Sequence, residues 1–178
     1  MVWIETGAPG LSPTLTHRNL PQLILKAREK LLGHFRPLIS HFGLTEQQWR
    51  ILRTLGEMKQ LEPRQIGESC HILSPSLAGV LARMEENGLI TRTRFETDQR
   101  RVTVGLTAKG QGLVDELSPL ISAQYQVIEE SFGPELIREL YDLMDRVLEV
   151  DDHAIAKLPL PKRKRRLTKP VKALQRTA

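Results

Sequence analysis

Residues 61–95 decide the fold of this chain, and they have the sequence LEPRQIGESCHILSPSLAGVLARMEENGLITRTRF. Pro63 and Pro75 each mark the first turn of a predicted helix, because proline fixes a backbone angle that a helix start requires. Only the tripeptide His71-Ile72-Leu73 connects these two helices. Asn87-Gly88 ends the second one, since glycine readily adopts the left-handed backbone that follows many helices. The pattern therefore predicts two short helices joined by a tight turn.

The sequence after Gly88 changes from a helical period to an alternation of apolar and polar residues. Residues 89–95 and 102–106 alternate in this way, which predicts two paired strands. A short polar loop, residues 96–101, joins the strands into a hairpin and contains two arginines. Two short helices followed by a basic hairpin make a winged helix-turn-helix, a motif whose second helix enters the major groove of DNA.

Longer predicted helices flank this motif. Residues 16–42 have apolar side chains at a period close to 3.6, which predicts an amphipathic helix that is bent or broken near Pro37. Thr45 begins the next helix with a capping box, and that helix runs to about Met58. Its predicted inward-facing residues are Trp49, Leu52, Leu55 and Met58.

Two helices are predicted after the hairpin, from Thr107 to about Ser131 and from Pro134 to about Ala156. Apolar residues in the last helix have a 4-3-4-3 spacing that suits packing against a partner helix; they are Leu136, Leu140, Leu143, Val147 and Val150. The expected fold is mainly α (α+β), a winged helix-turn-helix with long N- and C-terminal helices that form a dimerisation domain.

The chain divides into four expected segments. Residues 1–14 form an N-terminal arm, and residues 45–106 form the winged helix-turn-helix DNA-binding domain. Residues 15–44 and 107–156 form the helical dimerisation region, and residues 157–178 form a basic, disordered tail.

Composition narrows the class of protein. The 178 residues are 40% hydrophobic but only 4% aromatic, which favours a helical core of Leu, Ile and Val over an aromatic-rich β architecture. A single cysteine, Cys70, excludes an internal disulfide framework and a multi-cysteine metal site. No apolar stretch predicts a membrane-spanning helix, and residues 1–10 lack a secretory signal, so we expect a cytoplasmic protein with no membrane partner.

The formal net charge of +5 is unevenly distributed. Residues 159–178 contain eight Lys or Arg and no acid, which leaves 18 basic and 21 acidic residues in the rest of the chain. Residues 110–158 have a net charge of −8, whereas residues 1–109 are net positive. DNA phosphates repel the acidic part and attract the basic part, so the charge distribution favours one orientation on DNA.

Sequence signatures of catalysis are missing. The chain has no glycine-rich phosphate loop, no nucleophile elbow and no His/Glu set at metal-binding spacing. We therefore expect a protein that is not an enzyme and that needs neither a metal nor a cofactor.

The order of elements resembles the MarR family of bacterial transcriptional regulators. The wing carries Asp98-x-Arg100 and is followed by Leu106-Thr107 and Gly110, which is similar to that family's wing-to-helix signature. Residues 85–90, Glu-Glu-Asn-Gly-Leu-Ile, resemble the exit of its recognition helix. The similarity extends over roughly residues 15–155. It implies a homodimeric repressor, nucleoid-associated when bound, on a pseudo-palindromic double-stranded operator.

Other segments resemble the HpaR branch of this family. They are Arg18-Asn19-Leu20-Pro21, Ala27-Arg28-Glu29, Phe35-Arg36-Pro37-Leu38, the run Gly43 to Arg50, and Leu73-Ser74-Pro75-Ser76-Leu77. The branch is associated with repressors of aromatic-acid catabolism, of the hydroxyphenylacetate or hydroxynicotinate type. The resemblance implies a phenolic or pyridine carboxylate effector. Gly79 departs from the pattern, since many relatives present Arg or His to DNA there.

Candidate DNA contacts lie on the recognition helix and the wing. Ser74, Ser76 and Leu77 occupy the first turn of the recognition helix, although Ser74 could serve only as a cap. Arg83 either reaches DNA or pairs with Glu85 or Glu86.

On the wing, Arg100 and Arg101 follow Asp98, which either orients Arg100 toward the minor groove or holds the turn together. Arg92 and Arg94 either follow the DNA backbone or protect an edge strand from aggregation.

Candidate effector contacts lie on the first two long helices. An aromatic acid needs an apolar wall and a positive or hydrogen-bonding group for its carboxylate. Arg18, Arg28, His34 and Trp49 are the candidates. The alternatives are a core position for Trp49, a partly buried structural role for His34, and salt bridges across the dimer for the two arginines.

Three other functions remain open at the sequence level. Cys70 could sense oxidants on the same fold, although no Lys or Arg lies within three residues to favour a thiolate. The chain could also be a non-specific architectural DNA-binding protein, or an interaction module that does not bind DNA. The basic tail either binds flanking phosphates or is dispensable.

Overall fold

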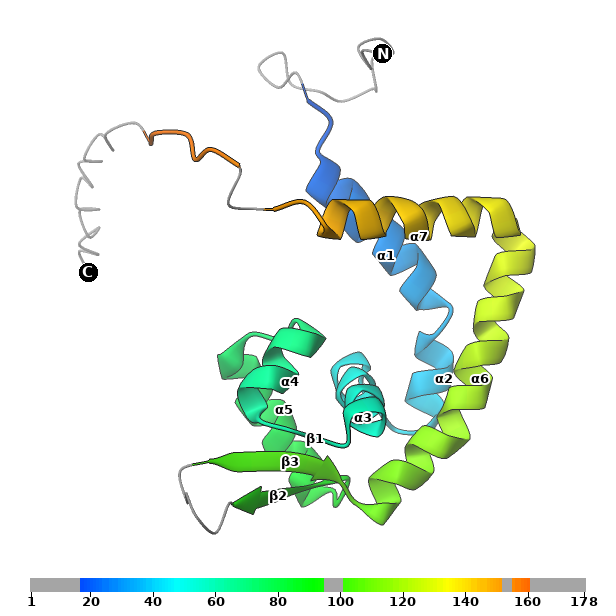
Figure 1. The fold of residues 1–178 in the computed structure, drawn as a ribbon. Coiled ribbons are helices and arrows are strands. Elements are labelled where there is room, and N and C mark those ends of the chain that lie inside the picture. The colour runs from blue at the N-terminus through cyan, green and yellow to red at the C-terminus, as the bar shows by residue number, and fades with distance from the viewer. Residues whose placement is uncertain (1–16, 95–100, 152–154, 161–178) are drawn as a thin grey trace, which may run out of the picture. The chain divides into compact units, whose positions relative to one another are not determined.

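Helices make up most of the described residues of the computed structural model, which are 17–94, 101–151 and 155–160 (Figure 1). The elements in chain order are α1 (Leu20–Gly33), α2 (Arg36–His41), α3 (Glu46–Met58), β1 (Gln60–Leu61), α4 (Pro63–Cys70), α5 (Ser74–Glu86), β2 (Ile90–Arg94), β3 (Val102–Leu106), α6 (Ala108–Phe132) and α7 (Pro134–Leu148). The predicted mainly α fold class is confirmed. The N-terminal arm, the wing tip and most of the basic tail lie outside the described residues.

Helix α3 forms the centre of the core. Thr45 caps it with the predicted capping box, in which the Gln48 amide donates to Thr45 Oγ1 at 3.2 Å. Ile51, Leu52 and Leu55 are all 0% exposed. The inward position predicted for Met58 is wrong, since this side chain is 54% exposed at the end of the helix.

The N-terminal helical segment is interrupted, as the proline predicted. Helix α1 starts at Leu20, four residues later than the pattern suggested, and Asn19 caps it by accepting from the Gln22 amide at 3.0 Å. The helix ends at Gly33, and α2 starts at Arg36 with Pro37 in its first turn. Proline lacks the N–H that a continuous helix would require, so a new helix begins there.

The two helices of the central motif, α4 and α5, approach closely at Gly67. A Cβ atom placed on Gly67 would lie 3.3 Å from both the Ile72 carbonyl oxygen and Leu77 Cδ2. The predicted cap at Ser74 is wrong, because Ser74 is already helical. Leu73 is the cap, and its carbonyl accepts the first helical hydrogen bond, from the Leu77 amide at 2.9 Å.

The hairpin belongs to a three-stranded sheet. Its strand order is β1-β3-β2, and both pairings are antiparallel. The predicted pairing of the two hairpin strands is confirmed, and its register joins Ile90 to Leu106 and Arg94 to Val102. The sequence did not indicate β1, because two residues are too few to show an alternating pattern.

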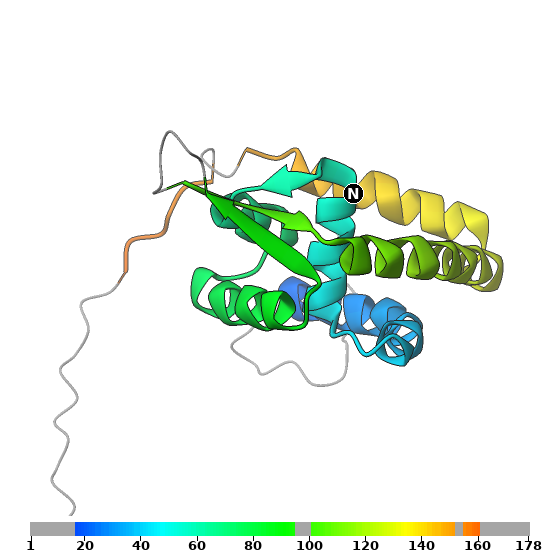
Figure 2. The same ribbon diagram turned by 90° about the horizontal axis from the view of Figure 1, so that it is seen from below.

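The joint between β3 and α6 holds the sheet against the helices. Strand β3 leads directly into α6 (Figure 2). Thr107 caps α6 by accepting from the Gly110 amide at 3.0 Å, and its hydroxyl donates to the Gly88 carbonyl at 2.7 Å. Because Gly110 has no side chain, the first turn of α6 can lie directly against the Leu89 carbonyl.

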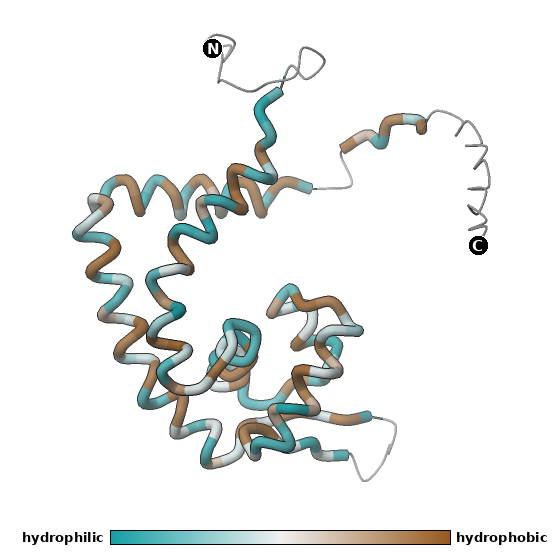
Figure 3. Tube along the Cα trace, turned by 180° about the vertical axis from the view of Figure 1, so that it is seen from behind, coloured by the Kyte–Doolittle hydropathy of each residue, from teal (hydrophilic) through white to brown (hydrophobic). Residues whose placement is uncertain are grey.

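The chain divides into two units after Pro134. In the second unit, Ile137 of α7 is buried, but most of the apolar seam is exposed, with Leu143 at 49% and Val147 at 54%. Apolar and polar residues alternate along α7 (Figure 3). The helix ends at Leu148, before the predicted end near Ala156. This division does not test the predicted dimerisation region, which stays a prediction.

Gly110 provides a direct test of the β3–α6 joint. A Cβ atom on Gly110 would lie 2.1 Å from the Leu89 carbonyl oxygen. We expect Gly110→Ala to lower the free energy of unfolding by about 3 kcal/mol, at the upper end for overpacking. Urea denaturation at fixed protein concentration measures this.

Gly112 is the matched control on the same helix, because a Cβ atom there has no neighbour within 4 Å. Gly112→Ala should raise the free energy of unfolding by about 0.5–1 kcal/mol, since alanine favours a helix interior. Equal effects of the two substitutions would contradict this account of the joint.

Candidate functional site

A small pocket lies between α1, α2, α3 and α6. Its volume is about 160 Å³, similar to the roughly 150 Å³ of an apolar cavity that holds benzene. The lining residues are Leu32, Phe35, Ile39, Glu46, Trp49, Arg50, Arg53, Ile121 and Tyr125. The site therefore combines apolar walls with a few charged groups, as small-molecule sites generally do.

Aromatic side chains form the walls of this pocket. Phe35 and Trp49 are each 8% exposed, and Ile39 is 2% exposed. The rings of Phe35 and Tyr125 lie 4.7 Å apart between centroids at an angle of 50°. A flat ring is complementary to such walls, because aromatic rings favour offset or tilted contacts with one another.

Two arginines of α3 line the same pocket. The Arg50 side chain donates to the Cys70 carbonyl at 2.6 Å, which fixes it against the end of α4. Arg53 pairs with Glu57 at 3.1 Å, and its side chain remains 53% exposed. The hydrogen bond with Glu57 raises the pKa of Arg53 above its ordinary value, so this guanidinium stays charged. Arg53 is thus available to a second anionic partner.

A second hollow lies on the other side of Arg53. It has a volume of about 370 Å³ and shares Trp49, Arg53, Ile121 and Tyr125 with the first pocket. Gly56, Glu57, Val114, Ser118 and Ser122 complete its lining. Arg53 and Tyr125 therefore line both hollows, and the second hollow is the more polar of the two.

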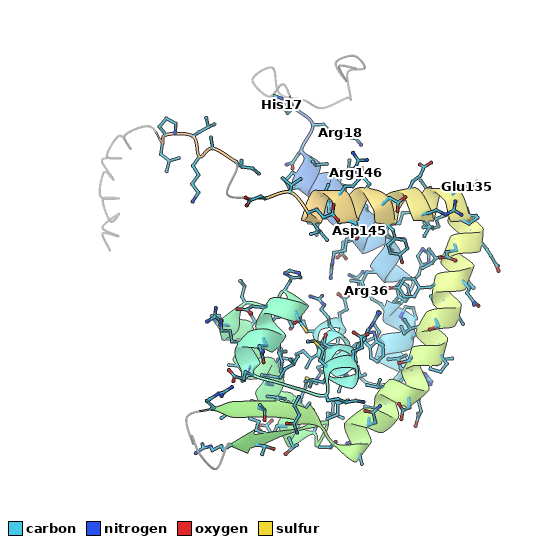
Figure 4. All side chains as sticks on the ribbon, viewed as in Figure 1. His17, Arg18, Arg36, Glu135, Asp145 and Arg146 are labelled. Carbon is cyan, nitrogen blue, oxygen red and sulfur yellow. The ribbon has the colours of Figure 1, made fainter. Side chains whose placement is uncertain are left out.

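An ion-pair network borders the pocket through Glu46. Glu46 pairs with Arg36 and lies 3.6 Å from Arg28, while Glu29 pairs with Arg36 and lies 2.6 Å from Arg28. Arg36 lies where α2 begins (Figure 4). The hydrogen bond from Arg36 lowers the pKa of Glu29, and the bonds to Glu29 and Glu46 raise the pKa of Arg36. The network links α1 and α2 to the start of α3.

Of the four predicted effector contacts, the structure places only Trp49 in the pocket. Arg28 belongs to the ion-pair network, and Arg18 is exposed before the start of α1 (Figure 4). His34 is exposed, with its ring 6.5 Å from that of Phe132. These three residues do not line the pocket: Arg18 precedes α1, Arg28 is engaged by Glu29 and Glu46, and His34 follows the end of α1 with an exposed side chain.

The sequence analysis missed Arg53, Phe35 and Tyr125. Arg53 follows Trp49 by four residues, a spacing that puts both side chains on the same face of α3. That spacing was a usable signal for Arg53. Tyr125 is contributed by α6, and nothing in the local sequence indicates its contact with Phe35.

The recognition helix α5 has one buried and one open face. Ser74 and Ser76 are exposed in its first turn, as a DNA contact requires. Leu77 is only 4% exposed, so its predicted contact with DNA is wrong and its side chain belongs to the core. Arg83 is exposed and makes no ion pair within the described residues, whereas Glu85 pairs with Arg92 at 3.1 Å.

The arginines of the wing have different surroundings. Arg94 is exposed at the end of β2. Arg101 donates to Glu62 Oε1 from Nη2 at 2.5 Å and from Nε at 3.0 Å, which ties the wing to the start of α4. Arg100 and Asp98 lie outside the described residues, so their predicted pairing stays a prediction.

Comparison with known proteins identifies the family. The family model described as MarR family matches residues 44–102. The chain is 37% identical to the HTH-type transcriptional regulator FarR of Neisseria gonorrhoeae, over 76% of this chain and 93% of that protein. It is 35% identical to the homoprotocatechuate degradative operon repressor of Escherichia coli, over 80% of this chain and 97% of that protein. The chain belongs to the MarR family.

A solved structure supports the same assignment. The structure of NadR in complex with 4-hydroxyphenylacetate has a TM-score of 0.66 and 35% sequence identity to this chain. It covers 79% of this chain and 100% of the NadR chain. The predicted resemblance to MarR regulators is therefore confirmed, and this chain is a transcriptional regulator of the MarR family. Its relatives are transcriptional regulators, which are not enzymes.

The burial of Cys70 bears on the alternative that this MarR protein senses oxidants. Cys70 is 0% exposed, with its Sγ atom 3.4 Å from Thr54 Oγ1, and a fully buried thiol is poorly accessible to an oxidant. The structure thus favours a structural role for Cys70 over redox sensing.

None of the helices in the described ranges is both long enough and apolar enough to cross a membrane.

The ion-pair network gives a prediction for acid stability. Because the pKa of Glu29 is lowered in the folded protein, its ion pair stabilises the fold above the unfolded pKa. This stabilisation is lost as the pH falls through the lower, folded pKa. We expect Glu29→Gln to make the loss of stability between about pH 5 and pH 3 shallower, as measured by urea denaturation across that range.

Glu130→Gln is the control for this experiment, since Glu130 is an exposed residue of α6 outside the described ion pairs. Its stability should depend on pH as that of the wild type does. If the Glu29 and Glu130 variants give parallel curves, the network does not contribute to acid stability.

Proposed function

We propose that this protein represses an aromatic-acid catabolic operon and is released from its operator by a small phenolic or pyridine carboxylate. The observation that carries the proposal is the apolar, aromatic-walled pocket with the charged Arg53 at its edge. The relatives support the ligand class, because NadR has been solved with 4-hydroxyphenylacetate and another relative is a homoprotocatechuate operon repressor.

The proposed effector lies with its ring between Phe35, Trp49 and Tyr125 and with its carboxylate toward Arg53. Ring burial supplies most of the affinity, since apolar contact area is the main favourable term in such pockets. A charge-assisted hydrogen bond from Arg53 then selects a carboxylate over a neutral group. Glu46 does not oppose the anion strongly, because Arg36 and Arg28 already compensate its charge.

The proposed DNA interface comprises the exposed start of α5 and the wing. Ser74, Ser76 and Arg83 enter the major groove, and Arg92, Arg94, Arg100 and Arg101 contact the backbone or the minor groove. In support of this placement, Arg83 and Arg94 have exposed side chains without ion pairs among the described residues. Paired recognition helices would then occupy half-sites about 34–36 Å apart on a pseudo-palindromic operator at the nucleoid.

Unpartnered apolar faces support a homodimer. Helix α1 has no buried residue, and Leu20, Leu23, Ile24 and Leu25 are between 37% and 60% exposed. In the other unit, the α7 seam is exposed at Leu136, Leu143 and Val147. Apolar faces of this kind are stable in water when a second copy covers them.

The position of the pocket supports a mechanism by which the effector releases the protein from its operator. Its walls come from α1 and α2, which the proposed dimer holds, and from α3, which belongs to the DNA-reading part. A ligand at this joint shifts the separation of the two recognition helices only if it binds the DNA-free arrangement more tightly. We propose that it does, and that the protein acts on transcription without an enzymatic activity of its own.

Arg53 provides the sharpest test of the effector site. We expect Arg53→Gln to weaken binding of 4-hydroxyphenylacetate or 6-hydroxynicotinate about 10–100-fold, the value of one charge-assisted hydrogen bond. Isothermal titration calorimetry with the full chain measures this. The neutral 4-hydroxyphenylacetamide should bind the wild type and the variant equally weakly.

Arg64→Gln is the matched control, because Arg64 also pairs with a glutamate four residues later, Glu68, at 2.8 Å. It should leave effector binding unchanged. Should neither acid bind the wild type, or should both variants bind alike, the proposed effector site would be wrong.

The exposed seam of α7 provides a test of the dimer. Leu143→Asp places a carboxylate in the proposed interface, which should cost roughly 2 kcal/mol or more. We expect sedimentation to show monomers at micromolar concentration and operator affinity to fall with dimer content. Arg138→Asp, on the opposite face of α7, should leave a dimer. A wild-type monomer that still binds an operator fragment would refute this model.

A further inference from the structure

Leu73 is an exposed apolar residue whose side chain has no evident structural role. It is 80% exposed at the turn between α4 and α5, whereas the neighbouring apolar residues Ile72 and Leu77 are buried. Leu73 is also the N-cap of α5, and it makes no side-chain cap hydrogen bond. Ser, Thr, Asp or Asn would stabilise the helix better at that position. The leucine side chain contributes neither to the core nor to the cap.

The centre of the outward face of α5 lacks polar side chains before Glu86 in the last turn. Leu77, Val80, Leu81 and Met84 are buried, so the helical period puts Pro75, Gly79 and Ala82 at the centre of the opposite face. None of these three has a polar side chain. A Cβ atom on Gly79 would lie 3.6 Å from Arg83 Nη1, so the one arginine of this helix extends along it over Gly79.

The exposed side chains of Leu73 and Pro75 therefore form an apolar leading edge at the start of the recognition helix. The first turn of such a helix ordinarily contacts base edges in the major groove. The thymine C5-methyl is the apolar group that base pairs present there, and apolar side chains are its usual contacts. A leading edge without amide or guanidinium groups suits that methyl group better than it suits guanine or adenine edges.

We propose that Leu73 recognises a thymine methyl group in each operator half-site, with Pro75 enlarging the contact. This inference depends on the proposed function, since it names the feature of the operator that the recognition helix selects. Ser74, Ser76 and Arg83 supply the hydrogen bonds on either side of the apolar contact.

The test replaces thymine by deoxyuracil, which removes the methyl group and keeps base pairing. The full-length protein first selects its preferred sequence from a random duplex library. Each thymine of the selected duplex is then replaced in both half-sites, and binding is measured by fluorescence anisotropy at fixed salt. We expect one or two symmetric replacements to weaken binding about tenfold or more, since one buried methyl is worth about fourfold per half-site.

Variants of Leu73 connect that effect to this side chain. Leu73→Ala should weaken binding to the thymine duplex and remove the penalty for deoxyuracil at the same position, while Leu73→Met should retain most of the penalty. Binding to a scrambled duplex should not change, because it depends on phosphate contacts. Leu158→Ala is the matched control, because Leu158 is 87% exposed. The exposed Leu73 side chain can be truncated without a cavity, so the melting temperature should stay the same.

Two results would overturn this inference but not the proposed function. In the first, the protein binds a selected sequence but loses no affinity when deoxyuracil replaces any thymine. In the second, the loss of affinity with deoxyuracil persists in the Leu73→Ala variant. A different result would overturn the proposed function as well. If no sequence is enriched and the full-length protein binds no duplex at low salt, the chain is not an operator-binding repressor.

Discussion

The burial of α3 is the constraint on which the rest of this structure depends. One side of the helix places Ile51, Leu52 and Leu55 in the core of the winged helix-turn-helix. Another side contributes Trp49, Arg50 and Arg53 to the pocket. An α-helix of three turns moves largely as one body, so the two sides of α3 are mechanically linked. A single helix thereby joins the proposed effector pocket to the core of the winged helix-turn-helix.

Charge compensation around Glu46 suits the pocket to the proposed anionic effector. Glu46 would repel a carboxylate, but Arg36 and Arg28 surround it. Arg53 pairs with the exposed Glu57 and interacts with Tyr125, and its guanidinium is half exposed, so it can turn toward a ligand at small cost. The same ion pairs join α1 and α2 to α3, so the proposed effector site beside Glu46 lies at the junction of these helices.

Local sequence signals predicted the elements well. Pro63, Pro75 and Asn87-Gly88 placed α4 and α5 to within a residue, and Thr45 and Thr107 marked the starts of α3 and α6. The predictions failed at the end of a helix and for a very short strand. Met58 continued the apolar period of α3 but lies where the helix ends, and β1 is too short to be recognised. Leu77 was assigned to the DNA face from its position in the first turn, although the helical period puts it with Val80 and Met84 in the core.

The sequence by itself determined the order of the elements, the winged motif and the membership of a regulator family, because these follow from short-range patterns and capping residues. Only the tertiary structure decided which side chains form the effector pocket. Phe35, Arg53 and Tyr125 are far apart in the sequence and meet because α2, α3 and α6 pack together. Ion pairs with Glu29 and Glu46 likewise engage Arg28 outside the pocket. Local periodicity determines which face of a helix is apolar, but packing determines what that face meets.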